Sequence, residues 1–244
     1  MTINEFVRRI ADSASSYPDK IFSKKGNIYT CVNPFSYHLV RKHPYIYENM
    51  DGLFVDGMTM CWWIRLLWRK KIPRLSFDMS GMASDLFDRL NKEDSNESIY
   101  FIGAKQTELE GTINQIRQTY PHIIISGYRN GYFIDIDDRN NAISEILSQN
   151  PSFTIIGMGS PLQEQFALDL KTAGYMGIAF TCGGFLHQTS HKINYYPNWV
   201  NKLNLRAFYR LTHEKGMFVR LWNVLIEFPI MFIGDSIKYT LSHR

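Results

Sequence analysis

Two segments of this chain hold residues whose types and spacing suit chemistry. An apolar run at residues 153–156 ends in Gly157-Met158-Gly159-Ser160-Pro161, and a helical pattern then opens with Gln163 and Glu164. Glycine lets a backbone turn sharply beside a ligand, and the first amides of a helix favour phosphate. The second segment is Asp56-Gly57, which follows another apolar run. The Asp56 carboxylate suits a general base for a sugar hydroxyl, although an Asp there can also simply cap a helix.

Glycines follow two further apolar runs. Gly103 either holds a phosphate or only turns the chain, and the segment from Gly127 to Phe133 surrounds Arg129 with aromatic side chains. Aromatic faces suit a nucleobase or a sugar ring. The residues expected to contact a substrate in these two places are Gly103, Gly127, Tyr128, Gly131 and Tyr132.

Strand and helix patterns alternate along much of the chain, as in parallel βαβ units. The expected strands are 20–23, 28–32, 53–55, 99–102, 122–125, 153–156 and 178–181. The expected helices are 2–14, 33–49, 58–69, 81–91, 107–119, 139–148 and 162–171. Open α/β sheets bind ligands at the carboxyl ends of their strands, so the residues named above should gather there. The sequence predicts an α/β fold with a Rossmann-like, mainly parallel sheet flanked by helices.

Beyond Gly183-Gly184 the alternation stops, and the chain becomes basic, aromatic and helical in pattern. We therefore expect a core at residues 1–194 and a helical C-terminal appendage at residues 195–244. Interleaved basic and aromatic residues suit a membrane surface, and Arg206 and Arg210 could clamp a diphosphate. Packing of this segment against the core or another subunit is the alternative, so a homo-oligomer stays open.

The composition is that of a globular protein, with 244 residues, 45% hydrophobic residues and a net charge of +4. That charge is too small to indicate nucleic-acid binding. The chain shows no secretory signal and no apolar run of about 20 residues, so a cytoplasmic location is expected. Cys31, Cys61 and Cys182 lack metal-site spacing and are expected to be buried free thiols. His187 and His191 are four residues apart and could bind a metal on one helical turn, but a loop or surface pair is favoured. We expect no metal site and no cofactor.

The order and spacing of these motifs resemble the WecG/TagA/CpsF family of bacterial glycosyltransferases (glycosyltransferase family 26). The resemblance runs from about Asn27 to Trp222. It rests on Thr30-Cys31-Val32-Asn33, Val55-Asp56-Gly57, Phe101-Ile102-Gly103, Gly127-Tyr128 with Gly131-Tyr132-Phe133, Gly157 to Glu164, Gly183-Gly184, Pro197-Asn198-Trp199 and Tyr209-Arg210-Leu211.

The resemblance implies an inverting, metal-independent glycosyltransferase with a Rossmann-like fold. Such an enzyme moves a sugar, N-acetylmannosamine or another hexose, from a UDP-sugar to a polyprenyl-diphosphate-linked acceptor. It works peripherally on the inner face of the cell membrane, in the biosynthesis of cell-surface polysaccharide. Asp56 matches the proposed general base, and the matching polar active-site residues are Thr30, Asn33, Gln163 and Glu164. The other substrate-binding positions expected around them are Gly57, Gly157, Gly159, Pro161 and Gly184.

Some positions depart from the family pattern. His187 stands where the family usually has Asp, and further departures are His191, Tyr195-Tyr196 and Arg206-Ala207. Either Asp78 or Asp85 takes the place of another family Asp. The departures motivate an alternative, a catalytically inactive nucleotide-sugar-binding or scaffold protein of envelope polysaccharide assembly. A nicotinamide-dependent oxidoreductase is disfavoured, because no strand is followed by GxGxxG.

Overall fold

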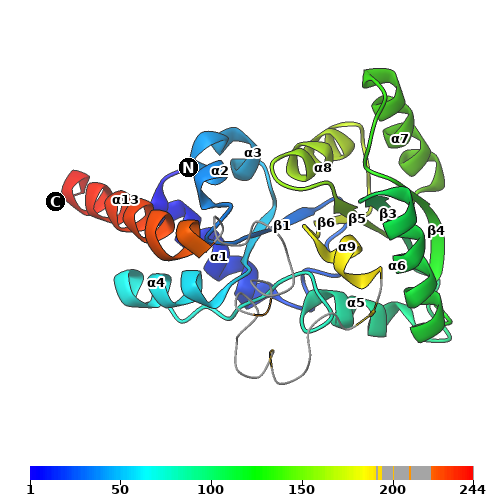
Figure 1. Cartoon of the computed structure of the whole chain (residues 1–244), viewed down its shortest axis with the longest axis horizontal. Helices are drawn as coiled ribbons and strands as arrows, with labels where there is room; N and C mark the ends of the chain where they lie inside the picture. Colours follow the sequence, from blue (N-terminus) through cyan, green and yellow to red (C-terminus); the bar gives the residue numbers. More distant parts are fainter. Residues whose placement is uncertain (191, 194–199, 201–208, 210–220, 244) are drawn as a thin grey trace.

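Six parallel strands form one sheet in the order β2-β1-β6-β5-β3-β4 within the part of the chain that the computed structural model describes (Figure 1). That part comprises residues 1–190, 192–193, 200, 209 and 221–243. The strands are β1 (Ile28–Val32), β2 (Gly52–Val55), β3 (Ser98–Gly103), β4 (Ile124–Arg129), β5 (Phe153–Gly157) and β6 (Ile178–Thr181). The expected α/β fold with a parallel sheet is therefore confirmed.

Helices cover both faces of this sheet. They are α1 (Ile3–Ser16), α2 (Tyr37–Lys42), α3 (Pro44–Glu48), α4 (Met58–Trp68), α5 (Met82–Leu90), α6 (Gln106–Thr119), α7 (Ile136–Gln149), α8 (Leu162–Thr172), α9 (Phe185–Thr189) and α13 (Phe228–Ser242). A π-helical turn, η1 (Asn223–Glu227), precedes α13. Strand residues alternate between two hydrophobic clusters: Tyr100 and Ile102 join the one with α1, α4 and α8, whereas Ile99 and Phe101 join the one with α5 and α6. Burial on both faces explains why the strands read as continuous apolar runs.

Two of the expected elements are wrong. Residues 20–23 form turns instead of a strand, because the Ile21 and Phe22 amides donate to the Pro18 carbonyl, and the Phe22 ring is buried against Phe153 and Phe180. The single helix expected at 33–49 is two helices, since Pro44 begins α3 and moves His43 out of the helical conformation.

The strand expected at 122–125 is also partly wrong, because β4 begins at Ile124 and includes Gly127, Tyr128 and Arg129. This strand pairs with β3 as far as Ile102↔Arg129, with a register shift between Ile99 and Tyr100. The sequence pattern ended the strand too early because it treated Gly127 as a turn residue.

The C-terminal helix α13 packs on α1, α2 and α4. Phe228 and Phe232 are fully buried against Tyr37, whose hydroxyl donates to Asp235 at 2.8 Å. Trp68 of α4 donates from Nε1 to the Ser236 hydroxyl at 3.1 Å. The expected boundary near residue 195 lies outside the described residues, so the division into core and appendage stays a prediction. No described helix combines the length and the apolar character needed to span a membrane.

Candidate functional site

The carboxyl ends of the strands bring the expected site residues to one edge of the sheet. Asn33 follows β1, Asp56 and Gly57 follow β2, and the turn from Met158 to Pro161 joins β5 to α8. Gly184 immediately precedes α9, which follows β6. The parallel pairing of the strands therefore places segments that are far apart in the sequence along a common rim.

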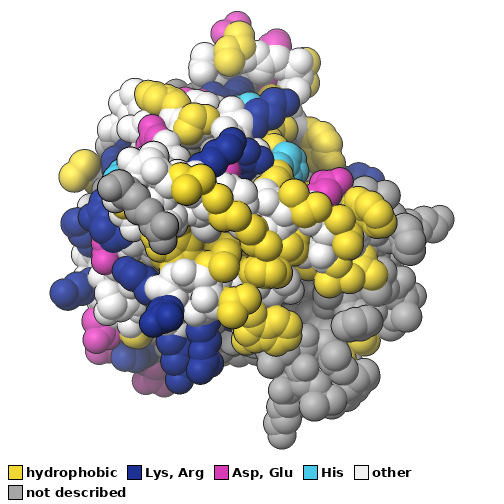
Figure 2. Space-filling view, turned by 90° about the vertical axis from the view of Figure 1, so that its left-hand side faces the viewer, with side chains coloured by type: hydrophobic (Ala, Val, Ile, Leu, Met, Phe, Trp, Pro, Cys, Tyr) yellow, Lys and Arg dark blue, Asp and Glu magenta, His cyan; other side chains and the backbone are white. Residues whose placement is uncertain are grey.

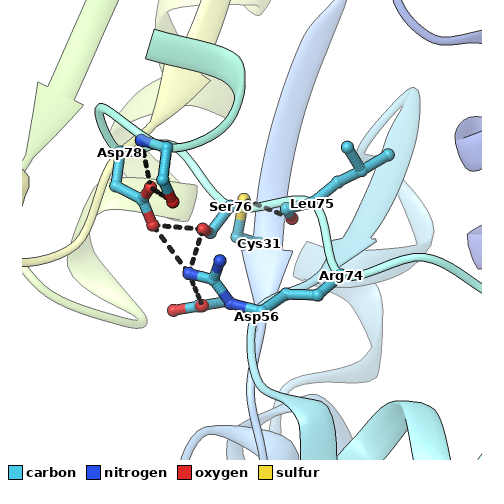
Figure 3. A network of polar contacts seen from close by, with 7 residues as sticks. Cys31, Asp56, Arg74, Leu75, Ser76 and Asp78 are labelled. Carbon is cyan, nitrogen blue, oxygen red and sulfur yellow. Dashed lines mark hydrogen bonds and ion pairs between the residues drawn. The ribbon is translucent and has the colours of Figure 1, made fainter. Parts of the chain in front are cut away.

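The first cluster at this edge is a carboxylate clamp, formed by Arg74 with Asp56, Ser76 and Asp78 (Figure 3). Arg74 Nη2 lies 3.1 Å from Asp56 Oδ1 and 2.7 Å from Asp78 Oδ2, and it also donates to the Ser76 hydroxyl. Burial disfavours the charged guanidinium, but the two carboxylates outweigh it and raise the pKa of Arg74. The clamp thus holds one permanent cation between two acids.

The backbone of the segment after α4 fixes this clamp against the sheet. The Leu75 amide donates to the Val55 carbonyl at 2.9 Å, so the segment continues alongside the end of β2. Asp78 Oδ1 accepts from the amide and hydroxyl of Ser80 at 2.8 and 2.7 Å. Asp85, by contrast, accepts from the Tyr17 hydroxyl. Of the two acids left open by the sequence, Asp78 is the one beside Asp56.

Among the described residues, Asp56 leaves one carboxylate oxygen without a partner. Its side chain is 39% exposed, and no described residue hydrogen-bonds to Oδ2. Arg74 holds only Oδ1, which fixes the direction of the carboxylate. A carboxylate held on one side and open on the other can accept a proton from a bound hydroxyl.

The second cluster is a sealed network around Glu164, the third residue of α8. Glu164 Oε1 accepts from Thr30 and Ser160 hydroxyls at 2.9 Å each and from Gln163 Nε2 at 2.8 Å. Thr181 Oγ1 donates to Thr30 Oγ1 at 2.7 Å. The network therefore ties the ends of β1, β5 and β6 to the start of α8.

Glu164 is fully buried, and its second oxygen, Oε2, has no hydrogen-bond partner among the described residues. Burial raises the pKa of this carboxyl above its usual 4.5, although its three hydrogen bonds oppose the shift. Burial, followed by the nearby Glu164 charge, also raises the pKa of Tyr47. Glu164 therefore holds neighbouring groups in place and is closed to solvent, in contrast to Asp56.

Gln163 and Asn33 both organise backbone at the rim. Gln163 Oε1 accepts from the Gly183 amide at 3.1 Å and is itself buried. Asn33 Oδ1 accepts from the Ser36 amide at 2.9 Å, which stabilises the turn before α2. Both side chains shape the loops that follow β6 and β1.

Some of the expected substrate-binding glycines lie at close contacts within the protein. A Cβ on Gly103, where φ is +142°, would lie 2.2 Å from the Gly157 carbonyl oxygen, so β3 and β5 could not pair as they do. A Cβ on Gly127 would lie 2.6 Å from the Tyr100 ring. Gly131 donates its amide to Ala104 at 3.1 Å, while Gly159 has open space around it.

The aromatic segment after β4 is largely engaged within the protein. Arg129 pairs with Asp138 at 2.6 Å and lies over the Phe133 ring, which stacks on Phe166. Tyr128 packs partly into the core, and Tyr132 is 64% exposed. Tyr132 is thus the side chain of this segment that is free to meet a ligand.

Several other expected groups lie elsewhere or outside the described residues. Arg206, Arg210 and His191 fall outside them, and His187 Nδ1 contacts Glu108 at 2.9 Å. The cysteines are free; Cys61 and Cys182 are buried, and Cys31 is partly buried. Burial raises the pKa of Cys61 to about 11. The described residues contain no group of three or more His, Cys, Asp or Glu side chains that could hold a metal ion.

The family model described as "Glycosyl transferase WecG/TagA/CpsF family" matches residues 1–242, nearly the whole chain. The chain belongs to this family. The WecG/TagA/CpsF protein described here is therefore an enzyme, a glycosyltransferase, and the resemblance of its motifs is confirmed.

Individual relatives of this glycosyltransferase include three curated proteins. It is 31% identical to "UDP-Gal:alpha-D-GlcNAc-diphosphoundecaprenol beta-1,4-galactosyltransferase" of Shigella boydii, over 86% of this chain and 87% of the relative. It is 27% identical to "N-acetylglucosaminyldiphosphoundecaprenol N-acetyl-beta-D-mannosaminyltransferase" of Bacillus subtilis (strain 168), over 84% and 78%. A protein of the same name from Bacillus spizizenii (strain ATCC 23059 / NRRL B-14472 / W23) is 21% identical, over 91% and 83%.

Sequence reasoning missed Arg74 and Ser76 in this glycosyltransferase. It also missed the hydrogen bonds that Ser160 and Thr181 contribute to the Glu164 network. One signal was present for the clamp: polar Arg74, Ser76 and Asp78 alternate with apolar Leu75 and Phe77. Alternation of this kind puts the polar side chains of an extended segment on one side.

Proposed function

We propose that this glycosyltransferase moves a hexose or N-acetylhexosamine from a UDP-sugar to an acceptor sugar linked to a polyprenyl diphosphate, with inversion at the anomeric carbon and without a metal ion. The product would enter cell-surface polysaccharide synthesis. The observation that carries the proposal is the half-open Asp56 carboxylate, held by Arg74 at the carboxyl edge of the sheet.

Asp56 serves as the general base in this proposal. Its Oδ2 takes the proton of an acceptor hydroxyl while that oxygen attacks the anomeric carbon of the donor. The bond from the anomeric carbon to the diphosphate oxygen breaks, and UDP leaves with the electron pair. A single displacement of this kind inverts the anomeric configuration.

The names of the relatives support the substrate classes. One names UDP-Gal as donor, and all three name an N-acetylglucosamine unit on diphosphoundecaprenol as acceptor. All three also name a β-linked product sugar, as inversion of an α-linked UDP-sugar would give. For this chain we propose the same acceptor class, with galactose and N-acetylmannosamine as the first donor sugars to test.

The clamp supports chemistry without a divalent ion. Asp56 and Asp78 are the two acids that face each other at this edge, and the Arg74 guanidinium contacts both of them. A guanidinium in that position neutralises the carboxylates that would otherwise suit a cation. We propose that the leaving diphosphate is stabilised by Arg206 and Arg210 together with backbone amides near Gly57, Gly157, Gly159 and Gly184.

The remaining site residues have positioning roles in this proposal. Thr30, Asn33, Gln163 and Glu164 shape the rim. Pro161 immediately precedes α8, and Gly103 and Gly131 bring strand ends together. Gly127 and Tyr128 support the wall from which exposed Tyr132 meets the donor or acceptor. We also propose that the C-terminal segment rests on the inner face of the cell membrane, where a polyprenyl-linked acceptor is held.

The deciding experiment assays the full chain with UDP-galactose and UDP-N-acetylmannosamine against N-acetylglucosamine linked to a short polyprenyl diphosphate. Transfer that persists in EDTA and gives a β-linked product is the expected result. Loss of transfer in EDTA that Mn²⁺ or Mg²⁺ restores would contradict the metal-free reaction. Binding of UDP-sugars with no transfer to any acceptor would favour the inactive scaffold.

A further inference from the structure

Helix α4 presents an apolar and basic face that no described residue covers. Met60, Cys61 and Ile64 point into the core, whereas Trp62 and Leu66 on the opposite side are 61% and 67% exposed. Residues 62, 65, 66 and 69 fall on one side of a helix of 3.6 residues per turn. The exposed side is thus a stripe of large apolar side chains and arginines on a helix whose other side is core.

The charged side chains on and beside this stripe are all positive. Arg65, Arg69, Lys70 and Lys71 are exposed and form no ion pair with any described residue. The sequence contains no Asp or Glu between Asp56 and Asp78. Four unpaired cations beside exposed Trp and Leu match a surface with anionic headgroups above an apolar interior.

The neighbouring helix extends the same surface. Trp68 of α4 packs on Tyr239 of α13, with 5.6 Å between ring centroids, so the two helices are direct neighbours. On α13, Ile230, Ile237 and Leu241 are exposed and lie near one another around the helix. Figure 2 shows hydrophobic side chains gathered in a band on this side of the molecule, with Lys and Arg side chains beside it.

We propose that the exposed face of α4 docks on an anionic lipid bilayer and sets the distance between that bilayer and Asp56. The proposal rests on the proposed function, since the acceptor there is a membrane lipid. Helix α4 begins two residues after Asp56, and a helix rises about 1.5 Å per residue, so Trp62 lies on the order of 10 Å from the clamp. A bilayer seated on Trp62 and Leu66 holds the acceptor diphosphate within reach of the base.

The apolar and the basic side chains of the α4 face should contribute differently to membrane binding. Trp and Leu side chains enter the boundary between headgroups and acyl chains and act on any bilayer. Arginine and lysine act only on anionic lipid, at about fivefold in affinity for each charge near the surface. Binding that depends on the lipid composition of the vesicles would therefore distinguish a bilayer from a protein partner.

The test measures binding of the full-length protein to vesicles of phosphatidylcholine with and without phosphatidylglycerol. The Arg65→Gln/Arg69→Gln/Lys70→Gln variant is expected to lose on the order of 100-fold in affinity for anionic vesicles only. Leu66→Glu is expected to lose about tenfold or more on both kinds. Matched controls are Lys24→Gln/Lys25→Gln, before the amino end of β1, and Ile134→Glu at a side chain that is 92% exposed elsewhere.

Turnover separates this proposal from the proposed function. With the acceptor in vesicles the α4 variants should slow down, and with a short, water-soluble acceptor they should match the parent. If the parent transfers sugar to neither acceptor, the proposed function fails, and the vesicle assay still decides the role of α4. Parent-like vesicle binding by both variants would overturn the docking proposal. So would self-association of the parent that Leu66→Glu abolishes while vesicle binding is unchanged, because α4 would then be an interface between copies.

Discussion

The clamp at Asp56 and the network at Glu164 lie at the same edge of the sheet and each leaves one carboxylate oxygen without a partner among the described residues. In Asp56 that oxygen belongs to a side chain that is 39% exposed, whereas in Glu164 it is fully buried. Arg74 balances the charge of Asp56, while Glu164 has only neutral donors around it. From this comparison we propose that Asp56, which is exposed and paired with a cation, is the reacting acid, and that Glu164, which is buried among neutral donors, is a structural one.

The largest expected effect comes from changing Asp56, the exposed carboxylate of this comparison. Asp56→Asn keeps the shape of the side chain and removes its basicity. We expect transfer to fall by about 10²–10⁴-fold, the usual contribution of a positioned base, with little change in melting temperature. Turnover with lipid-linked acceptor and a thermal melt together check this.

The control for Asp56→Asn is the same substitution at Asp85, an exposed acid on α5 that accepts from Tyr17. Asp85→Asn is expected to keep near-parental turnover. Near-parental turnover in Asp56→Asn instead would remove Asp56 from the chemistry and leave both carboxylates as structural.

A smaller effect is expected from the cation that orients Asp56. Arg74→Lys keeps the charge but cannot contact Asp56, Ser76 and Asp78 with one planar group. We expect kcat to fall by about 10–100-fold with KM for the donor little changed, because a misdirected base slows chemistry more than binding. Steady-state kinetics in both substrates measure the split.

Arg89→Lys is the matched control for this variant. Arg89 also makes a close pair with a carboxylate, Glu97, but at the amino end of β3. It should retain kcat within about twofold, since surface ion pairs contribute little. An equal loss of kcat in both variants would mean that Arg74 acts only through stability.

The sheet and the position of Asp56 were predictable because both depend on local patterns. Apolar runs of strand length, spaced by helical patterns, fix the parallel order of elements, and Asp56 follows one of these runs directly. Pro44 also carried a local signal, but the expectation of one helix at 33–49 ignored it. The strand expected at 20–23 failed because the Ile21-Phe22 pair is buried through a turn at Pro18, which periodicity cannot distinguish from a strand.

The contacts of the site were less predictable because they join distant segments. Thr30 meets Glu164 across 134 positions and Thr181 across 151, and no spacing rule encodes such pairs. Gln163 and Glu164 looked alike as polar residues opening a helix. Only the packed structure separates Gln163, which binds the loop after β6, from Glu164, which lies beneath the rim.

The smallest expected effect comes from changing Glu164, the buried carboxylate of the comparison. Glu164→Gln preserves an oxygen that can accept from Thr30, Ser160 and Gln163, and it removes a carboxyl group that burial disfavours in the charged form. We expect the variant to melt about 2–4 °C above the parent at neutral pH, the shift that about 1 kcal/mol produces in a chain of this size. Transfer should stay within about threefold of the parent, because in the proposed function the fully buried Glu164 positions its neighbours and does not react.

The pH dependence of that gain follows from the raised pKa of Glu164. Above the ordinary value of 4.5, the folded protein holds a proton that the unfolded chain has released, so the stability of the parent falls as pH rises toward the folded pKa. Glu164→Gln lacks this loss, and its advantage in melting temperature should grow from acidic to neutral pH. The control is the same substitution at exposed Glu145, which accepts from Tyr100 at 2.8 Å and should not raise the melting temperature when replaced. If Glu164→Gln abolished transfer while melting like the parent at every pH, Glu164 would belong with Asp56 among the reacting groups, and burial would no longer separate the two carboxylates.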